Sequence, residues 1–155
     1  KQGGTVIIHS NTEENVRKAI LHPDVMIASD GFDVVEKQGH PRSAAAFAKI
    51  LRQYVREEKA LRLTVAIRKM SLMPAQRLER RVPAMRNKGR IRIGADADLA
   101  IFDPAKVADR ATYEDPAAFS AGMHWVLVNG TFVVIDGKPV DHIYPGQAIR
   151  APITR

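Results

Sequence analysis

The stretch up to Gly31 alternates between apolar and polar segments in an order that restricts the fold strongly. Apolar runs occupy 6–8 and 25–28, and a helix-forming segment at 13–21 separates them. Asn11 followed by Glu14 predicts the start of that helix, as an N-cap and its capping-box partner. Strand, helix and strand in this order predict a βαβ unit, which implies a parallel sheet and a right-handed crossover.

The second predicted strand ends in Ser29-Asp30-Gly31, a small residue, a carboxylate and a glycine. In an α/β protein a buried strand delivers an acid to the mouth of a site in this way, and the glycine lets the backbone turn away. A cation, Arg42, follows soon after in His40-Pro41-Arg42. Asp30 is therefore a candidate catalytic residue, with a helix cap or an Asx turn as the structural alternative.

Helical spacing dominates the next part of the chain. Apolar positions predict an amphipathic helix over 43–58 and a second helix over 63–70. Pro74 is suited to the first turn of a further short helix at 75–78.

Beyond Val82 the pattern changes to short β-rich runs separated by turns. These runs predict strands at 91–93, 99–102, 125–128, 132–135 and 138–140. Asn129-Gly130 is a strong hairpin sequence, because both residues tolerate the positive φ of a type I′ turn. Asp136-Gly137 predicts another turn. We therefore expect the second half to form a small antiparallel β module.

Composition limits the class of protein. With 155 residues the chain has the length of one domain and can bury a sizeable core. No apolar run approaches ~20 residues, so no membrane span is expected, and the start lacks the apolar region of a signal peptide. Cysteine is absent, which leaves His, Asp and Glu as possible metal ligands. We expect an intracellular, cytoplasmic protein.

A basic run lies between positions 77 and 92, with Glu79 as its single acid. Its members are Arg77, Arg80, Arg81, Arg86, Lys88, Arg90 and Arg92, in a chain of net charge +7. Such a run is typical either of a phosphate-binding patch for nucleic acid or of a solvated face that keeps a protein soluble. No aromatic residue is interleaved and no nucleic-acid-binding motif accompanies the run. The solvated face is the favoured interpretation, and no nucleic-acid partner is expected.

Asp30 cannot form a metal site alone, because a mononuclear zinc centre uses about three protein ligands. The histidines are His9, His22, His40, His124 and His142, and none is paired at a spacing of two or four residues. His9 ends the first predicted strand and so shares the strand-end face with Asp30, which makes it the best second ligand. For each histidine a structural or exposed role is the favoured interpretation.

Several segments nevertheless resemble one enzyme family. Ser29-Asp30-Gly31, His40-Pro41-Arg42 and the run 66–71 with Pro74-Ala75 are similar to the C-terminal third of D-aminoacylases. These enzymes are N-acyl-D-amino-acid deacylases of the amidohydrolase superfamily. The runs 88–94, 97–103 and 126–130 resemble the closing β segment of the same superfamily.

The resemblance implies an α/β fold and a role for two residues. Residues 1–81 would be the C-terminal part of a (β/α)8 barrel, and residues 82–155 the C-terminal segment of a small β domain. The implied activity is hydrolysis of the amide bond of N-acyl-D-amino acids, with one or two zinc ions bound mainly by residues upstream. Asp30 would be the acid that approaches the metal, a possible ligand that takes a proton from bound water and later protonates the leaving amine. By the same resemblance Arg42 would bind the substrate's α-carboxylate; a surface salt bridge is the structural alternative, and it is the favoured interpretation of Arg42 without the resemblance.

Two departures leave the substrate preference open. The segment 43–47 lacks the Gly-Thr-Phe typical of D-aminoacylases, and 78–83 also differs from the usual pattern. One alternative is another amidohydrolase, such as a cyclic amidase or a dipeptidase-like enzyme. Another is a non-catalytic binding module that uses the basic run for an anionic partner.

The isolated chain is expected to be inactive, because two strands cannot close a barrel. Its exposed edges favour self-association or association with the missing N-terminal part.

Overall fold

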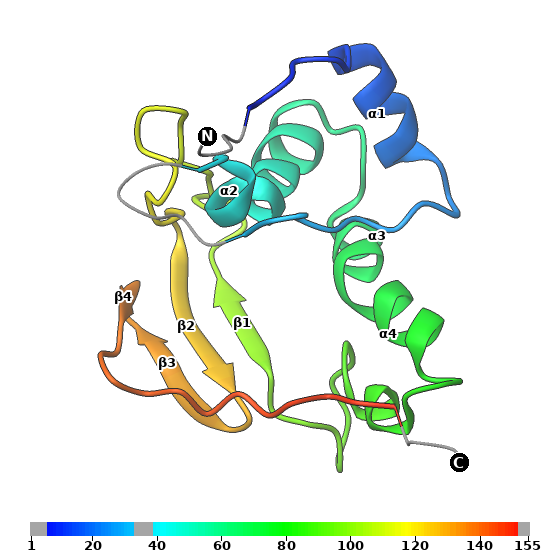
Figure 1. Cartoon of the computed structure of the whole chain (residues 1–155), viewed down its shortest axis with the longest axis vertical. Coiled ribbons are helices and arrows are strands. Elements are labelled where there is room, and N and C mark those ends of the chain that lie inside the picture. Colours follow the sequence, from blue (N-terminus) through cyan, green and yellow to red (C-terminus); the bar gives the residue numbers. More distant parts are fainter. Residues whose placement is uncertain (1–5, 33–38, 152–155) are drawn as a thin grey trace, which may run out of the picture.

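The computed structural model describes residues 6–32 and 39–151, and Figure 1 shows helices on one side and an antiparallel sheet on the other. The first helix is α1 (Glu13–Leu21), and α2 (Arg42–Lys49) continues into the π-helical turn η1 (Ile50–Glu57). A second continuous rod consists of α3 (Leu63–Ile67), η2 (Arg68–Leu72) and α4 (Met73–Leu78). A short 3₁₀ helix, η3 (Pro83–Asn87), follows it.

The predicted helices are confirmed, with two local differences. The cap of α1 is Thr12 rather than Asn11: its hydroxyl accepts a hydrogen bond from the Asn15 N–H at 3.3 Å. Pro74 lies in the first turn of α4, as predicted, but α4 runs on directly from η2 and is not a separate helix. The wider π-helical turn before it accommodates a residue that has no N–H to donate.

The second half forms the predicted antiparallel sheet, in the order β1-β2-β3-β4. Its strands are β1 (Leu99–Phe102), β2 (Met123–Val128), β3 (Thr131–Ile135) and β4 (Lys138–Pro139). Asn129 and Gly130, with φ of 49° and 78°, form the predicted turn between β2 and β3. Asp136 and Gly137 form the next turn, with φ of 50° and 75°.

Three predicted strands are wrong. Residues 6–8 and 25–28 carry no strand, so the predicted βαβ unit and its parallel sheet do not form among the residues described here. A strand is defined by its hydrogen-bonded partner, and the Ile27 N–H instead bonds to the Lys69 carbonyl oxygen at 3.0 Å. The run 91–93 is also unpaired, and Ile91 and Ile93 are almost fully exposed.

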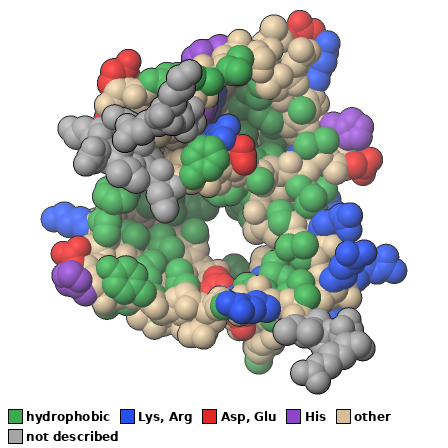
Figure 2. Space-filling view, in the orientation of Figure 1, with side chains coloured by type: hydrophobic (Ala, Val, Ile, Leu, Met, Phe, Trp, Pro, Cys, Tyr) green, Lys and Arg blue, Asp and Glu red, His purple; other side chains and the backbone are tan. Residues whose placement is uncertain are grey.

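The core lies where η1, α3 and the loop after β1 meet. Ile50, Leu51 and Tyr54 of η1 pack there with Ala66, and the β half contributes Val107, which is 1% exposed. The two halves therefore share one core. Figure 2 shows an opening between the helices and the sheet, bordered by many hydrophobic side chains.

Lys69 is a buried cation that fastens the segment before Asp30 to η2. Its ammonium donates a hydrogen bond to the carbonyl oxygen of His22, and the residue is only 1% exposed. Burial lowers the pKa of the Lys69 ammonium. In the part of the chain described by the structure, no helix has the length and apolar character needed to cross a bilayer.

Candidate functional site

Asp30 is held at the entrance to α2 by a network of short bonds around Gly31. The Gly31 N–H donates to the Ser29 hydroxyl and the Phe32 N–H donates to the Ser43 hydroxyl, each at 3.2 Å. A Cβ on Gly31 would lie 2.8 Å from the Ser43 Cα, so the glycine permits this close approach. The left-handed backbone belongs to Asp30, at φ 51°, and its side chain is 79% exposed.

Arg42, the first residue of α2, contacts Asp30 in two places. Its Nη2 lies 2.9 Å from the Asp30 Oδ2, and its Nε donates to the Asp30 backbone oxygen at 2.7 Å. The Phe32 ring supports the guanidinium from one face, with 4.9 Å from Cζ to the ring centroid. The structure thus brings the two predicted site residues together, and their contacts fix the plane of the guanidinium.

His40 is a member of this site that the sequence did not indicate on its own. Its Nδ1 accepts the backbone N–H of Arg42 at 3.1 Å, and its ring meets Tyr113 edge to face at 5.5 Å between centroids. Partial burial and the Arg42 cation, with a further contribution from His9, lower the pKa of His40, and Asp30 opposes them. The imidazole is therefore neutral at pH 7.

The remaining histidines do not gather around Asp30. His9 lies against Tyr113, at 5.2 Å between ring centroids, and His124 lies beside Trp125. The His22 Nδ1 accepts a backbone N–H two residues on. Across 6–32 and 39–151, no three His, Asp or Glu side chains are grouped closely enough to hold a metal ion.

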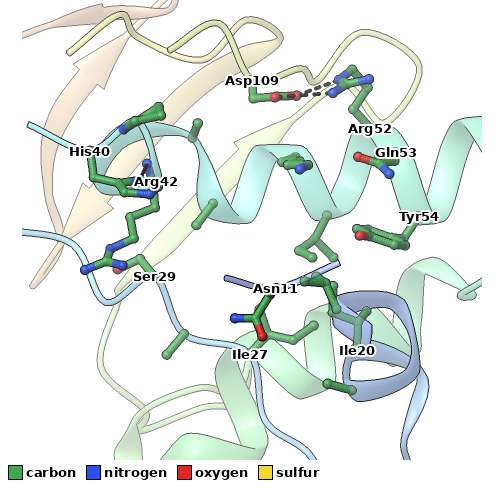
Figure 3. Close-up of a pocket in the computed structure, with 18 of the residues that line it drawn as sticks. Asn11, Ile20, Ile27, Ser29, His40, Arg42, Arg52, Gln53, Tyr54 and Asp109 are labelled. Atoms are coloured by element: carbon green, nitrogen blue, oxygen red, sulfur yellow. Dashed lines mark hydrogen bonds and ion pairs between the residues drawn. The ribbon is translucent and has the colours of Figure 1, made fainter. Parts of the chain in front are cut away.

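A cavity of about 750 Å³ opens beside the pair, between α1, the segment 25–29, one face of α2 and η1, and the loop 109–113. Figure 3 shows His40 and Arg42 at one end and Arg52, Gln53 and Tyr54 at the other, with Asn11 and Ile20 on a facing wall. Arg42 lines the cavity, whereas Asp30 is not one of its lining residues.

At the far end of the cavity the charged side chains are held in ion pairs and hydrogen bonds with one another. Arg52 donates to both Asp109 oxygens, at 2.5 and 3.3 Å, and to Glu57 at 2.8 Å, which raises the pKa of the guanidinium. Burial raises the pKa of Asp109, but the bonds from Arg52 outweigh it and the net shift is downward. The Tyr54 hydroxyl donates to Glu13, and this bond lowers the pKa of the Glu13 carboxyl. These pairs join η1 to the loop after β1 and to α1 at this end of the cavity.

The basic run is partly committed to internal bonds. The Lys88 ammonium lies 2.5 Å from Asp98 and 2.9 Å from Asp96, and Arg90 bonds to Glu79 at 2.9 Å. Two of the seven cations of the run are therefore held by acids of the chain itself.

A family model described as "Amidohydrolase family" matches residues 7–138, which include the Asp30–Arg42 pair and most of the sheet. The chain belongs to the amidohydrolase family. The predicted resemblance to D-aminoacylases is confirmed by individual relatives. An N-acyl-D-glutamate deacylase of Alcaligenes xylosoxydans xylosoxydans is 38% identical over 138 residues, which is 89% of this chain and 27% of that protein.

Solved structures agree with the family assignment. A D-aminoacylase described as defining a novel subset of amidohydrolases is 34% identical, with a TM-score of 0.75 over 84% of this chain and 26% of that one. The N-acyl-D-glutamate deacylase from Bordetella bronchiseptica, complexed with zinc and a phosphonate inhibitor, is 36% identical with a TM-score of 0.71, over 83% of this chain and 27% of that one. This amidohydrolase chain spans about a quarter of the length of its relatives.

Proposed function

We propose that this chain forms part of a zinc-dependent amidohydrolase that hydrolyses the amide bond of N-acyl-D-amino acids. The observation that carries the proposal is the Asp30–Arg42 pair, 2.9 Å apart at the edge of a cavity. A carboxylate beside a guanidinium combines a proton acceptor with a carboxylate receptor, the two functions that such a substrate requires.

Arg42 is proposed to bind the α-carboxylate of the substrate. A planar guanidinium donates two parallel hydrogen bonds to a carboxylate, which orients the ligand as well as attracting it. The bond from Nε to the Asp30 backbone oxygen and the contact with Phe32 hold the Arg42 plane in place. A substrate carboxylate would replace the Asp30 side chain on Nη2 and release it for proton transfer.

Asp30 is proposed as the catalytic residue. Its exposed carboxylate can accept a proton from the attacking water and later donate it to the leaving amine. The described residues do not build a metal site by themselves. One or two zinc ions are proposed for the whole enzyme because the similar N-acyl-D-glutamate deacylase was solved with zinc, and they would be held mainly by residues outside this chain, with Asp30 as a possible ligand.

The proposed placement within the whole enzyme assigns residues 1–81 to the C-terminal part of a (β/α)8 barrel. Residues 82–155 are assigned to the small β domain. Residues 6–8 and 25–28 carry the composition of buried strands but have no strand partner in the described part of this chain. Strands from the rest of a barrel would supply those partners.

The test uses the longer protein that contains this chain, purified with zinc and offered N-acetyl-D-methionine and a hydantoin separately. Hydrolysis of the acylated D-amino acid supports the proposal, and Arg42→Lys should then raise KM about tenfold, because Lys cannot form the bidentate contact. Hydrolysis of the hydantoin alone would assign the chain to a cyclic amidase. Turnover of neither compound would overturn the proposal.

A further inference from the structure

We infer that Tyr113, on the loop between β1 and β2, is a specificity-determining residue that contacts the side chain of the bound D-amino acid. This inference rests on the proposed function, since it takes Arg42 as the carboxylate receptor. It assigns part of the substrate site to the β half of the chain.

The loop that carries Tyr113 is fastened to the helices over much of its length. The Arg56 Nη1 donates to the Val107 carbonyl oxygen at 2.5 Å, and the Ser120 hydroxyl donates to the Ala44 carbonyl oxygen at 3.1 Å. The Arg52–Asp109 pair adds a third attachment. A loop held at three places on α2 and η1 can position a side chain as precisely as a regular element does.

The local turn fixes Tyr113 at the tip of this loop. The Thr112 hydroxyl accepts the N–H groups of Glu114 and Asp115, at 3.2 and 3.1 Å, and the Thr112 N–H donates to the Asp115 carbonyl oxygen at 3.1 Å. This is an ST turn, in which a hydroxyl orders the backbone that follows it. Tyr113 remains 47% exposed, so its ring is accessible.

Tyr113 and Arg42 lie on one continuous stretch of the cavity wall. The Tyr113 ring meets the His40 imidazole, and the His40 Nδ1 accepts the backbone N–H of Arg42. All three residues line the cavity. The Tyr113 ring also meets the His9 imidazole edge to face, at 5.2 Å between centroids.

The chemistry of this wall indicates which substrates it suits. When Arg42 holds the α-carboxylate, the amino-acid side chain is attached one carbon away and must lie against the neighbouring wall. There it meets the Tyr113 ring and the neutral imidazole of His40, which offer apolar faces. The wall therefore suits D-amino acids with apolar side chains long enough to reach the ring.

The experiment measures kcat/KM of the longer protein with N-acetyl-D-leucine and N-acetyl-D-alanine. Tyr113→Ala should lower the value for the leucine substrate about tenfold, mainly through KM, and that for the alanine substrate less than about twofold, because its methyl group does not reach the ring. Tyr113→Phe keeps the ring and removes only the hydroxyl, so the ratio of kcat/KM for the leucine substrate to that for the alanine substrate should stay within about twofold of the wild-type ratio. The matched control is Phe119→Ala, a 70% exposed aromatic of the same loop that does not line the cavity.

A second variant keeps the inference testable if Tyr113→Ala does not fold. Tyr113→Lys places a cation beside the substrate side chain and should move the preference about tenfold from leucine toward glutamate substrates. An unchanged leucine-to-alanine ratio, or equal losses with both substrates, would overturn the inference and leave the proposed function standing. A wild-type protein that hydrolyses neither substrate would overturn both.

Discussion

At the scale of single residues, Asp30 is the side chain whose substitution should remove activity while leaving the fold unchanged. Asp30→Asn keeps the size of the side chain and an oxygen that can accept from Arg42, but it removes the proton acceptor. We expect kcat of the longer protein to fall about a thousandfold, within the range for loss of a general base. Circular dichroism should show an unchanged fold.

The control for that measurement is Glu14→Gln, which neutralises an exposed acid that pairs with Lys18 on α1. It should leave kcat unchanged. Full activity in Asp30→Asn would remove Asp30 from the catalytic role.

Sequence reasoning found some of these residues and missed others for a physical reason. Asp30 is a candidate because a carboxylate at the end of an apolar run is a local pattern, whereas the role of Arg42 rests on the resemblance to D-aminoacylases, and both roles stay predictions. Tyr113 could not be predicted, because its contacts with His9 and His40 join distant parts of the chain. Nothing in the residues around Tyr113 indicates which surface its loop will meet.

At the scale of elements, the turn between β2 and β3 is attached to the rest of the chain by Asp98. One carboxylate oxygen accepts the Asn129 N–H at 2.7 Å, and the other lies 2.5 Å from the Lys88 ammonium. The hydrogen bond from Lys88, followed by that from the Asn129 backbone, lowers the pKa of Asp98 below its ordinary 3.8. The same bond raises the pKa of Lys88.

Because the pKa of Asp98 is lowered in the folded state, its contribution to the free energy of unfolding depends on pH in a direction that can be stated. Asp98 stabilises the fold at pH values above its unfolded pKa, and this contribution is lost as the pH falls through the folded pKa. Asp98→Asn should therefore lower the free energy of unfolding by about 1 kcal/mol at pH 6, the scale of a partly exposed charged pair. The difference should vanish near pH 2, as measured by urea unfolding. Asp141→Asn, at an exposed acid, serves as the control, and a difference that persists in acid would contradict the assignment.

Gly122 at the start of β2 should tolerate no side chain. Its φ is +73°, and a Cβ there would lie 2.4 Å from the Val107 backbone nitrogen. Gly122→Ala should cost about 2 kcal/mol or more, from strain and displacement of the buried Val107. Gly94→Ala, at φ +81° with no atom within 4 Å, isolates the backbone cost, which should be about 1 kcal/mol. Equal melting temperatures for the two variants would contradict the packing argument.

The elements that could be predicted are those whose hydrogen bonds close locally. α1, the rod 63–78 and the Asn129-Gly130 hairpin follow from spacing, prolines and turn residues within a few positions. The segments 6–8 and 25–28 have the composition of buried strands, but a strand also needs a neighbouring strand to which its backbone can hydrogen-bond. Their apolar composition is typical of strands buried inside a sheet. The described part of this chain contains no neighbouring strand for them.

At the scale of the whole molecule, large apolar side chains remain uncovered on several segments. The exposed fractions are 77% for Ile8, 90% for Ile91, 104% for Ile93 and 86% for Tyr144. Figure 2 shows hydrophobic side chains bordering the central opening as well. Scattered apolar residues are normal on a protein surface, but so many large ones, together with unpaired strand-like segments, favour association.

We therefore expect the isolated chain to self-associate. Light scattering should give a mass above the 17.2 kDa of one chain, and the mass should rise with concentration. The double variant Ile91→Ser and Ile93→Ser should lower the apparent mass, because it removes two exposed apolar side chains from one loop, whereas Lys138→Ser should not. In the longer protein, partner strands and the remaining domains would cover these surfaces, so the same double variant should there change solubility little. A monomeric isolated chain at all concentrations would show that these side chains are too dispersed to act as a contact surface.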